Sequence, residues 1–181
     1  MKSLLLFSVA LVSLTPFCLS QQSNAPDKPK LVVGIVVDQM RYDFLWRFWE
    51  LYGEGGFKKL VSDGYLCRNT KYNYMLTTTA PGHASIYCGT TPALHGIVDN
   101  GWYDRESGQS IYVVSDPNTT TVGNETNTAS ASPFRLLTST ITDELKLASK
   151  NSKVIGIALK DRASIMPVGH SPVGAYWFDF K

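Results

Sequence analysis

Two unbroken runs of apolar, mostly β-branched residues stand out along the chain, at residues 31–37 and 154–159. Neither run alternates with polar residues, which is typical of strands buried on both faces of a parallel sheet. Each run ends at a charged residue, the first at Asp38 and the second at Lys160. We expect residues 174–180, which are mostly aromatic, to form another strand.

Helical periodicity fills much of the chain between these runs. Apolar residues recur at helical spacing from Phe44 to Tyr52, and Gly53 closes that segment. The same signals predict a short helix that stops at Gly64, a helix from Pro81 to about Gly89, and a helical stretch that opens at 132–133 and is strongest at 141–148. Shorter strands are predicted at 65–70 and in a hairpin over 101–115, which turns at 105–108, returns at 111–114 and precedes a polar loop at 116–132.

Strands separated by helices predict an α/β fold, with a mostly parallel central sheet flanked by helices. The last predicted strand lies at the very end of the chain, and a domain seldom stops inside such structure. We therefore expect the sheet to be incomplete here and the chain to be an N-terminal fragment of a longer protein.

The N-terminus carries a short positive segment and an apolar stretch of about nine residues, as a signal peptide does. That stretch is too short for a membrane span, which needs about 20 apolar residues. We predict a cleaved signal peptide at residues 1–20 and a linker at 21–30, with lipid attachment at Cys18 as the alternative. Export leaves Cys67 and Cys88, which an oxidising compartment allows to pair.

Composition narrows the function only a little. Hydrophobic residues make up 44% of the chain and the net charge is +2, as in an ordinary globular domain. No dense stripe of Lys and Arg with interleaved aromatic residues occurs, so nucleic acid is not an expected partner. The spacing of Cys and His residues matches no zinc finger.

Candidate chemistry lies where strands are predicted to end, which is where functional residues gather in open parallel sheets. Asp38 follows the first strand, and its carboxylate could bind a metal ion or instead cap the next helix. Thr79 precedes a helix, where its hydroxyl could act as a nucleophile beside a phosphate or only cap that helix. Lys160 and Arg162 would face one phosphoryl group if their segment were extended, and a solvated charged turn is the alternative.

Asn100 and two histidines are further candidates. The amide of Asn100 could donate hydrogen bonds to a phosphate oxygen, or the residue could serve only as a turn former before Gly101. Isolated histidines are more often structural, so we do not assign His83 and His95 as metal ligands.

No single motif is decisive, but their order along the chain is specific. The stretches VVDQMR at 36–41, TTTAPGHAS at 77–85, GTTPALHGIVDN at 89–100 and LKDR at 159–162 together resemble the threonine-nucleophile periplasmic alkaline phosphatases. These enzymes belong to the alkaline phosphatase superfamily and are related to its nucleotide pyrophosphatase/phosphodiesterase branch. By this resemblance, residues 31–181 are the N-terminal part of a catalytic domain.

The resemblance implies a role for each candidate residue. Asp38 would be a zinc ligand, and Thr79 would be the nucleophile and would also touch zinc. Asn100, Lys160 and Arg162 would bind the transferred phosphoryl group. Two zinc ions would activate the nucleophile and support the leaving group, while a phosphothreonine forms and is then hydrolysed. Phosphate monoesters are the implied substrates, and the periplasm is the implied location.

One departure from the family pattern concerns the remaining zinc ligands. In the family these are aspartates and histidines well downstream of the Lys and Arg, whereas only His170 and Asp179 follow Arg162 here, and neither fits the pattern. We therefore expect the two-zinc site to be incomplete in these 181 residues, and the chain by itself to have little or no activity.

Three other functions stay open on the sequence. A phosphodiesterase or nucleotide pyrophosphatase of the same superfamily is the nearest, although two cations suit the more highly charged monoester better. A sulfatase would need Cys or Ser followed by Pro and Arg, where this chain has Thr79, Pro81 and His83. A non-catalytic exported module would retain phosphate without turning it over.

Overall fold

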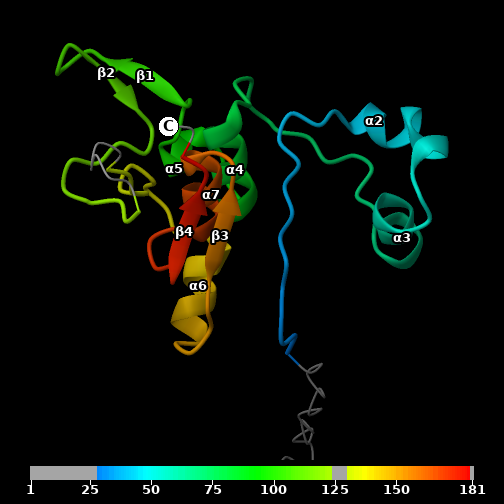
Figure 1. Ribbon diagram of the computed structural model, residues 1–181. Helices are drawn as coiled ribbons and strands as arrows, with labels where there is room; N and C mark the ends of the chain where they lie inside the picture. The colour runs from blue at the N-terminus through cyan, green and yellow to red at the C-terminus, as the bar shows by residue number, and fades with distance from the viewer. Residues whose placement is uncertain (1–27, 124–129, 180–181) are drawn as a thin grey trace, which may run out of the picture. The chain divides into compact units, whose positions relative to one another are not determined.

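The computed structural model describes residues 28–123 and 130–179 (Figure 1). The chain divides into two units, Met1–Ile35 and Val36–Lys181. Residues 28–35 of the first unit contain no helix or strand. The signal peptide predicted at 1–20 lies outside the described residues, as does most of the linker predicted at 21–30.

The second unit contains both helices and short strands. In chain order the elements are α2 (Tyr42–Arg47), the 3-10 helix η2 (Trp49–Leu51), α3 (Gly56–Asp63), α4 (Thr79–Cys88), α5 (Pro92–His95), β1 (Gly101–Asp104), β2 (Gln109–Tyr112), α6 (Ile141–Ala148), β3 (Ile155–Ala158), α7 (Asp161–Val168) and β4 (Gly174–Trp177). The helices predicted around Phe44, before Gly64 and before Gly89 are all present.

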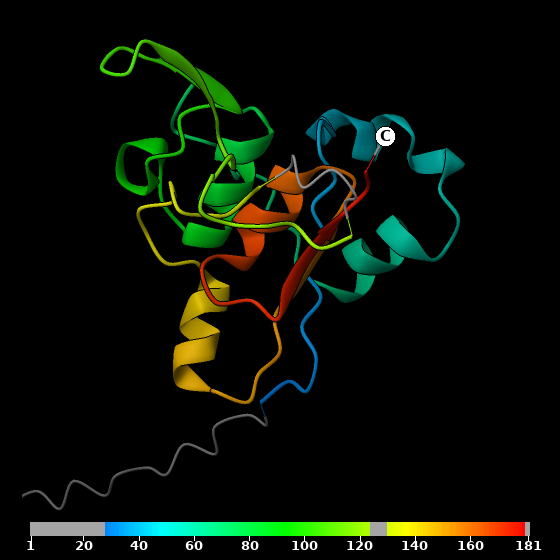
Figure 2. The ribbon, with the colours of Figure 1, turned by 60° about the vertical axis from the view of Figure 1, so that its left-hand side comes forward.

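A β3–α7–β4 unit, made of the last three elements in chain order, confirms the α/β class. β3 and β4 pair in parallel, from Ile155 opposite Gly174 to Ala158 opposite Trp177. Parallel neighbours need a crossover connection, and α7 provides it by packing against both strands (Figure 2). Gly156 permits this approach, because a Cβ there would lie only 2.5 Å from the backbone oxygen of Ser164.

The hairpin predicted over 101–115 is present as an antiparallel pair. Its register runs from Gly101 opposite Tyr112 to Asp104 opposite Gln109. The return strand was predicted at 111–114 but ends at Tyr112. The apolar residues that suggested the longer strand, Val113 and Val114, are fully buried in the core instead.

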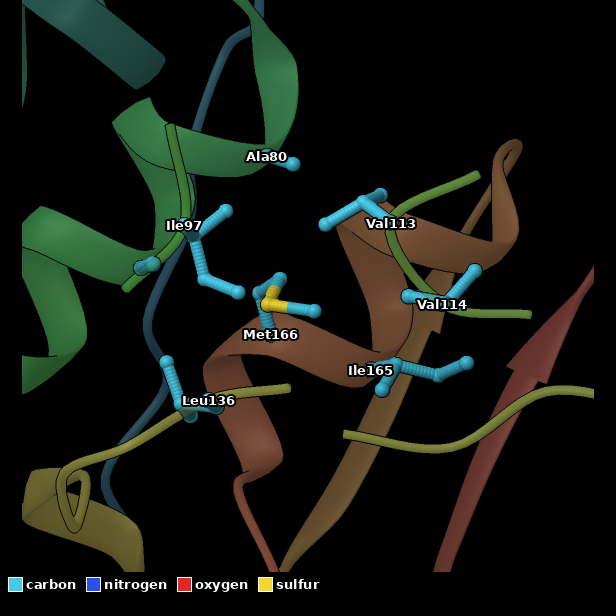
Figure 3. Packing of buried hydrophobic residues seen from close by; sticks show 8 residues of the cluster. Ala80, Ile97, Val113, Val114, Leu136, Ile165 and Met166 are labelled. Atoms are coloured by element: carbon cyan, nitrogen blue, oxygen red, sulfur yellow. The ribbon is translucent and has the colours of Figure 1, made fainter. Parts of the chain in front are cut away.

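The hydrophobic core lies where α4 packs against α7 (Figure 3). Both helices, the end of the hairpin and the loops around them contribute its buried members: Ala80, Ala84, Ile97, Val113, Val114, Leu136, Ile165 and Met166. This packing places the N-termini of the two helices within one folded unit, and those N-termini carry Thr79 and Arg162.

Local signals explain where the longer helices begin and end. α4 ends at Gly89, whose positive φ of 64° suits glycine at a helix C-terminus. α6 begins at a capping box, in which the Thr140 hydroxyl accepts from the Asp143 backbone N–H and the Asp143 carboxylate accepts from the Thr140 N–H. This box explains why the helix starts at Ile141 and not at the predicted start at 132–133.

Several predicted strands are wrong or shorter than expected. Residues 31–37 and 65–70 contain no strand, and the predicted strand at 174–180 is confined to Gly174–Trp177. A strand requires a neighbour to take its backbone hydrogen bonds, and in the described part of the chain no segment pairs with 31–37 or 65–70. β3 is also not buried on both faces, because Ile157 within it is 81% exposed.

Candidate active site

Three of the predicted residues meet around one carboxylate oxygen. The Thr79 hydroxyl donates a hydrogen bond to Oδ2 of Asp38 over 3.0 Å. Nζ of Lys160 lies 3.7 Å from the same oxygen. Thr79 is only 8% exposed, whereas the side chains of Asp38 and Lys160 are 41% and 49% exposed. A buried hydroxyl therefore lies beneath a solvent-facing ion pair.

Asp38 reaches Thr79 because it lies in a turn before α2 and not at the helix cap. The N-cap of α2 is Arg41, so the alternative that Asp38 caps this helix is wrong. Gln39 has a positive φ of 62°, and the Met40 N–H donates to the carbonyl of Val37. This turn leaves the Asp38 carboxylate available to the site.

Thr79 is the first residue of α4, but its hydroxyl does not cap the helix. Thr78 is the N-cap residue, and its own hydroxyl donates to Oδ1 of Asp99 at 2.7 Å. The Ala80 N–H is satisfied from outside by Oδ1 of Asn100 at 2.8 Å, and Pro81 has no N–H. The Thr79 hydroxyl therefore stays available at a helix N-terminus, which favours bound anions.

Asn100 contributes one end of its amide to the fold and leaves the other end for a ligand. Its Oδ1 accepts from α4, and within the described residues its Nδ2 has no hydrogen-bond partner. Asp99 fixes the residue by accepting from both the Asn100 N–H and the Thr78 hydroxyl through Oδ1. Asp99 was not selected from the sequence, although its position beside Asn100 was an available signal.

The second cation, Arg162, contacts different residues from those that Lys160 contacts. Lys160 is the N-cap of α7 and Asp161 begins that helix, so the extended segment expected to align the two cations is wrong. Nη1 of Arg162 donates to the Tyr112 hydroxyl at 2.7 Å, and that hydroxyl donates to Oδ1 of Asp161 at 2.6 Å. Nε of Arg162 is buried without a hydrogen-bond partner in the part of the chain described.

The electrostatics of this group keep Tyr112 protonated. Burial, and then the hydrogen bond to the Asp161 carboxylate, raise the pKa of Tyr112 to about 12. The adjacent guanidinium of Arg162 acts in the opposite direction but does not outweigh them. Tyr112 and Asp161 were not selected from the sequence, because only the fold brings a hairpin strand to the start of α7.

His83 and His95 both have hydrogen-bond partners within the fold. His83 Nδ1 lies 2.7 Å from the Thr79 carbonyl. His95 Nδ1 accepts from the Ile97 N–H, so its Nε2 carries the proton and donates to the Ser85 hydroxyl at 2.9 Å. Burial lowers the pKa of His95 and keeps it neutral.

Asp38 and Thr79 supply two oxygen donors 3.0 Å apart, of the types that bind divalent metals. Over residues 28–123 and 130–179, no group of three or more His, Cys, Asp or Glu side chains could hold a metal ion. His170 lies instead against Asp143 and the Leu136 carbonyl. The donors present thus fit part of a site for a divalent metal ion.

Two further findings concern the chain as a whole. Cys67 and Cys88 are unpaired, so the disulfide that export would allow is not formed. Among the described residues, no helix has the length and apolar character needed to cross a bilayer.

Comparison with known proteins places this chain in a family. Residues 32–177 match the Type I phosphodiesterase / nucleotide pyrophosphatase family, and the chain belongs to it. It is 51% identical over 162 residues to alkaline phosphatase PafA of Elizabethkingia meningoseptica. The matched region covers 88% of this chain and 30% of that protein. It is 50% identical over 153 residues to alkaline phosphatase PhoV of Synechococcus elongatus, covering 84% of this chain and 28% of that protein.

The fold is likewise similar to solved structures. The crystal structure of wild-type PafA superposes with a TM-score of 0.83 at 52% identity, covering 86% of this chain and 30% of that one. A PafA variant with substitutions of a threonine, an asparagine, a lysine and an arginine gives the same TM-score at 49% identity, covering 86% of this chain and 31% of that one. The chain thus spans about 30% of the length of these relatives.

Proposed function

We propose that the full-length protein is a zinc-dependent phosphatase that hydrolyses phosphate monoesters through a phosphothreonine at Thr79. The observation that carries this proposal is the buried Thr79 hydroxyl at the first turn of α4, hydrogen-bonded to the Asp38 carboxylate. A threonine hydroxyl is a weak nucleophile, and it needs a neighbouring group that lowers its pKa or accepts its proton.

In the first step, the Thr79 oxygen loses its proton and attacks phosphorus while the ester oxygen leaves and takes up a proton from solvent, so that one P–O bond forms as another breaks. In the second step, water attacks phosphothreonine, inorganic phosphate leaves, and the hydroxyl is restored. Asp38 orients the hydroxyl through its hydrogen bond. Zinc held in part by Asp38 and Thr79, when bound, would supply the positive charge that favours the alkoxide.

Three side-chain donor groups are available for the phosphoryl oxygens. They are the Nδ2 amide of Asn100, the ammonium of Lys160 and the guanidinium of Arg162. The Nε of Arg162 is buried without a hydrogen-bond partner among the described residues, which is unfavourable by about 1–3 kcal/mol. The variant of PafA substituted at a threonine, an asparagine, a lysine and an arginine supports this assignment by residue type and order.

Diester hydrolysis is the second candidate, because the matching family includes phosphodiesterases and nucleotide pyrophosphatases. The two activities differ in the charge of the phosphoryl group they stabilise, and Lys160 with Arg162 favours the monoester. Rates for an aryl phosphate monoester and the matching diester, measured on the same enzyme, separate them. Faster diester hydrolysis would replace the monoester assignment.

The nucleophile is tested by trapping the intermediate in the full-length zinc-loaded protein. After acid quenching with a monoester substrate, we expect mass spectrometry to find a phosphorylated peptide containing Thr79. Thr79→Ala should abolish both the phosphopeptide and turnover, whereas Thr70→Ala, at an exposed threonine, should change neither. Turnover that survives Thr79→Ala would rule out this nucleophile, and phosphate retention without turnover in the unmodified protein would favour a binding module.

Export to the periplasm is part of the same proposal. It rests on the apolar N-terminal stretch of the sequence, which precedes the family match at residue 32. N-terminal sequencing of protein recovered from the periplasm should begin at Gln21, and a retained Met1 would contradict it.

A further inference from the structure

The Tyr112 hydroxyl joins two charged groups at the start of α7. It accepts a hydrogen bond from Nη1 of Arg162 at 2.7 Å and donates one to Oδ1 of Asp161 at 2.6 Å. The guanidinium carbon of Arg162 also lies 5.8 Å from the centre of the Tyr112 ring, within the range of a cation–π contact. One side chain thus holds Arg162 from both its ring and its hydroxyl.

The backbone around Tyr112 connects this contact to Asn100. Tyr112 lies opposite Gly101 in the hairpin register, and the Val113 N–H donates to the Asn100 carbonyl at 3.1 Å. Asn100 and Tyr112 therefore occupy the two sides of the hairpin base. The Asn100 side chain is fixed in turn by the Ala80 N–H next to Thr79.

An arginine side chain has several rotatable bonds, and ordering it is entropically unfavourable. The Tyr112 contact orders it before a ligand arrives, which is the general basis of preorganised binding. The contact also persists in alkaline solution, because the pKa of Tyr112 is raised to about 12. A tyrosine with an ordinary pKa near 10 would begin to ionise in alkaline solution, and it would then lose the hydrogen that it donates to Asp161.

From this geometry we infer that Tyr112 is a positioning residue, which holds the Arg162 guanidinium at a fixed place relative to Asn100. The inference rests on the proposed function, in which both side chains bind the transferred phosphoryl group. Tyr112 acts through Arg162 and does not itself contact the phosphoryl group.

The test is a double-mutant cycle on the full-length zinc-loaded phosphatase, using Tyr112→Phe, Arg162→Ala and the double variant. The readouts are kcat/KM for an aryl phosphate monoester and the inhibition constant of inorganic phosphate. Tyr112→Phe keeps the ring and removes the hydroxyl with its hydrogen bonds to Arg162 and Asp161, so kcat/KM should fall about tenfold and phosphate should bind about tenfold more weakly. In the Arg162→Ala background, the same change should alter both values less than about twofold.

Tyr103→Phe is the matched control, since Tyr103 lies in the same hairpin with a 64% exposed side chain. It should leave both readouts unchanged. An unchanged urea-unfolding transition of Tyr112→Phe would exclude a general loss of structure. A general loss of structure would also lower activity equally in both backgrounds.

Two results would overturn the inference, and they differ in what else they overturn. If Arg162→Ala impairs the enzyme but Tyr112→Phe has no effect, or has the same effect in both backgrounds, Tyr112 does not act through Arg162 and the proposed function stands. If Arg162→Ala behaves as the unmodified enzyme, the phosphate-binding role of Arg162 is wrong as well.

Discussion

Replacing Gly156 by alanine tests whether the close contact between β3 and α7 positions the site. A Cβ at this residue would lie 2.5 Å from the Ser164 carbonyl oxygen and 2.6 Å from Cγ1 of Val168. Moving the Ser164 oxygen out to 3.0 Å requires α7 to shift by about 0.5 Å. The obstacle is backbone, which cannot rotate away as a side chain can, so we expect a loss of about 1–3 kcal/mol in the free energy of unfolding.

The same shift should also reduce phosphatase activity, because α7 carries Arg162 in its first turn. Misplacement of a catalytic group by about 1 Å can lower a rate about a hundredfold, so a loss of about tenfold in kcat/KM is expected here. The assays are urea unfolding followed by circular dichroism, and steady-state kinetics on the same preparations.

Gly53→Ala provides the matched control, since a Cβ there meets no atom within 4 Å. Both substitutions reduce the conformational freedom of the unfolded chain equally, so their difference isolates the clash in the folded state. If Gly156→Ala unfolds within about 0.5 kcal/mol of Gly53→Ala, the contact between β3 and α7 is not as close as described here.

Three further predictions concern the core and titratable groups. Met166 is fully buried, so Met166→Ala should lower the free energy of unfolding by about 2–5 kcal/mol, and the volume-conserving Met166→Leu by less than about 1.5 kcal/mol, in urea titrations. Burial would raise the pKa of Asp143, but hydrogen bonds from Thr140 and His170 outweigh it and lower the pKa below 3.8. The stability this provides is present above about pH 3.8 and lost as pH falls further, and acid titrations of Asp143→Asn should lack that loss. The raised pKa of Tyr112 favours its neutral form in the folded protein. The stability this provides is complete below about pH 10, is lost as pH rises towards about 12, and should be absent in Tyr112→Phe.

Elements with complete local signals could be predicted closely from the sequence. The strongest part of the helix predicted at 141–148 coincides with α6, because its periodicity and its capping residues lie within one short stretch. The hairpin turn at 105–108 was found for the same reason, with Gly108 at a φ of 67°. Residues 31–37 failed, since an apolar run becomes a strand only where another strand pairs with it.

The candidate site shows the same division between local and tertiary information. Asp38, Thr79 and Lys160 were selected by their places after strands or before a helix, and the structure brings these three together. The assignment of an extended segment after Lys160 failed although Asp161 carries a signal for a helical first turn. Tyr112 carried no signal, because its partners lie 49 and 50 residues away in the chain.

These separations bear on the order in which the contacts form as the chain folds. The Thr79–Asp38 and Arg162–Tyr112 hydrogen bonds close loops of 41 and 50 residues, and the Ala80–Asn100 bond closes one of 20 residues between them. The Lys160–Asp38 ion pair spans residues 38–160, which enclose the first and the last of these loops and nearly all of the Tyr112–Arg162 loop. Loop-closure entropy depends on the flexible chain that remains, so the outer pair becomes less unfavourable once the inner loops have closed. The ion pair would then form last, and its formation would report that the nucleophile, the amide and the guanidinium are already in place.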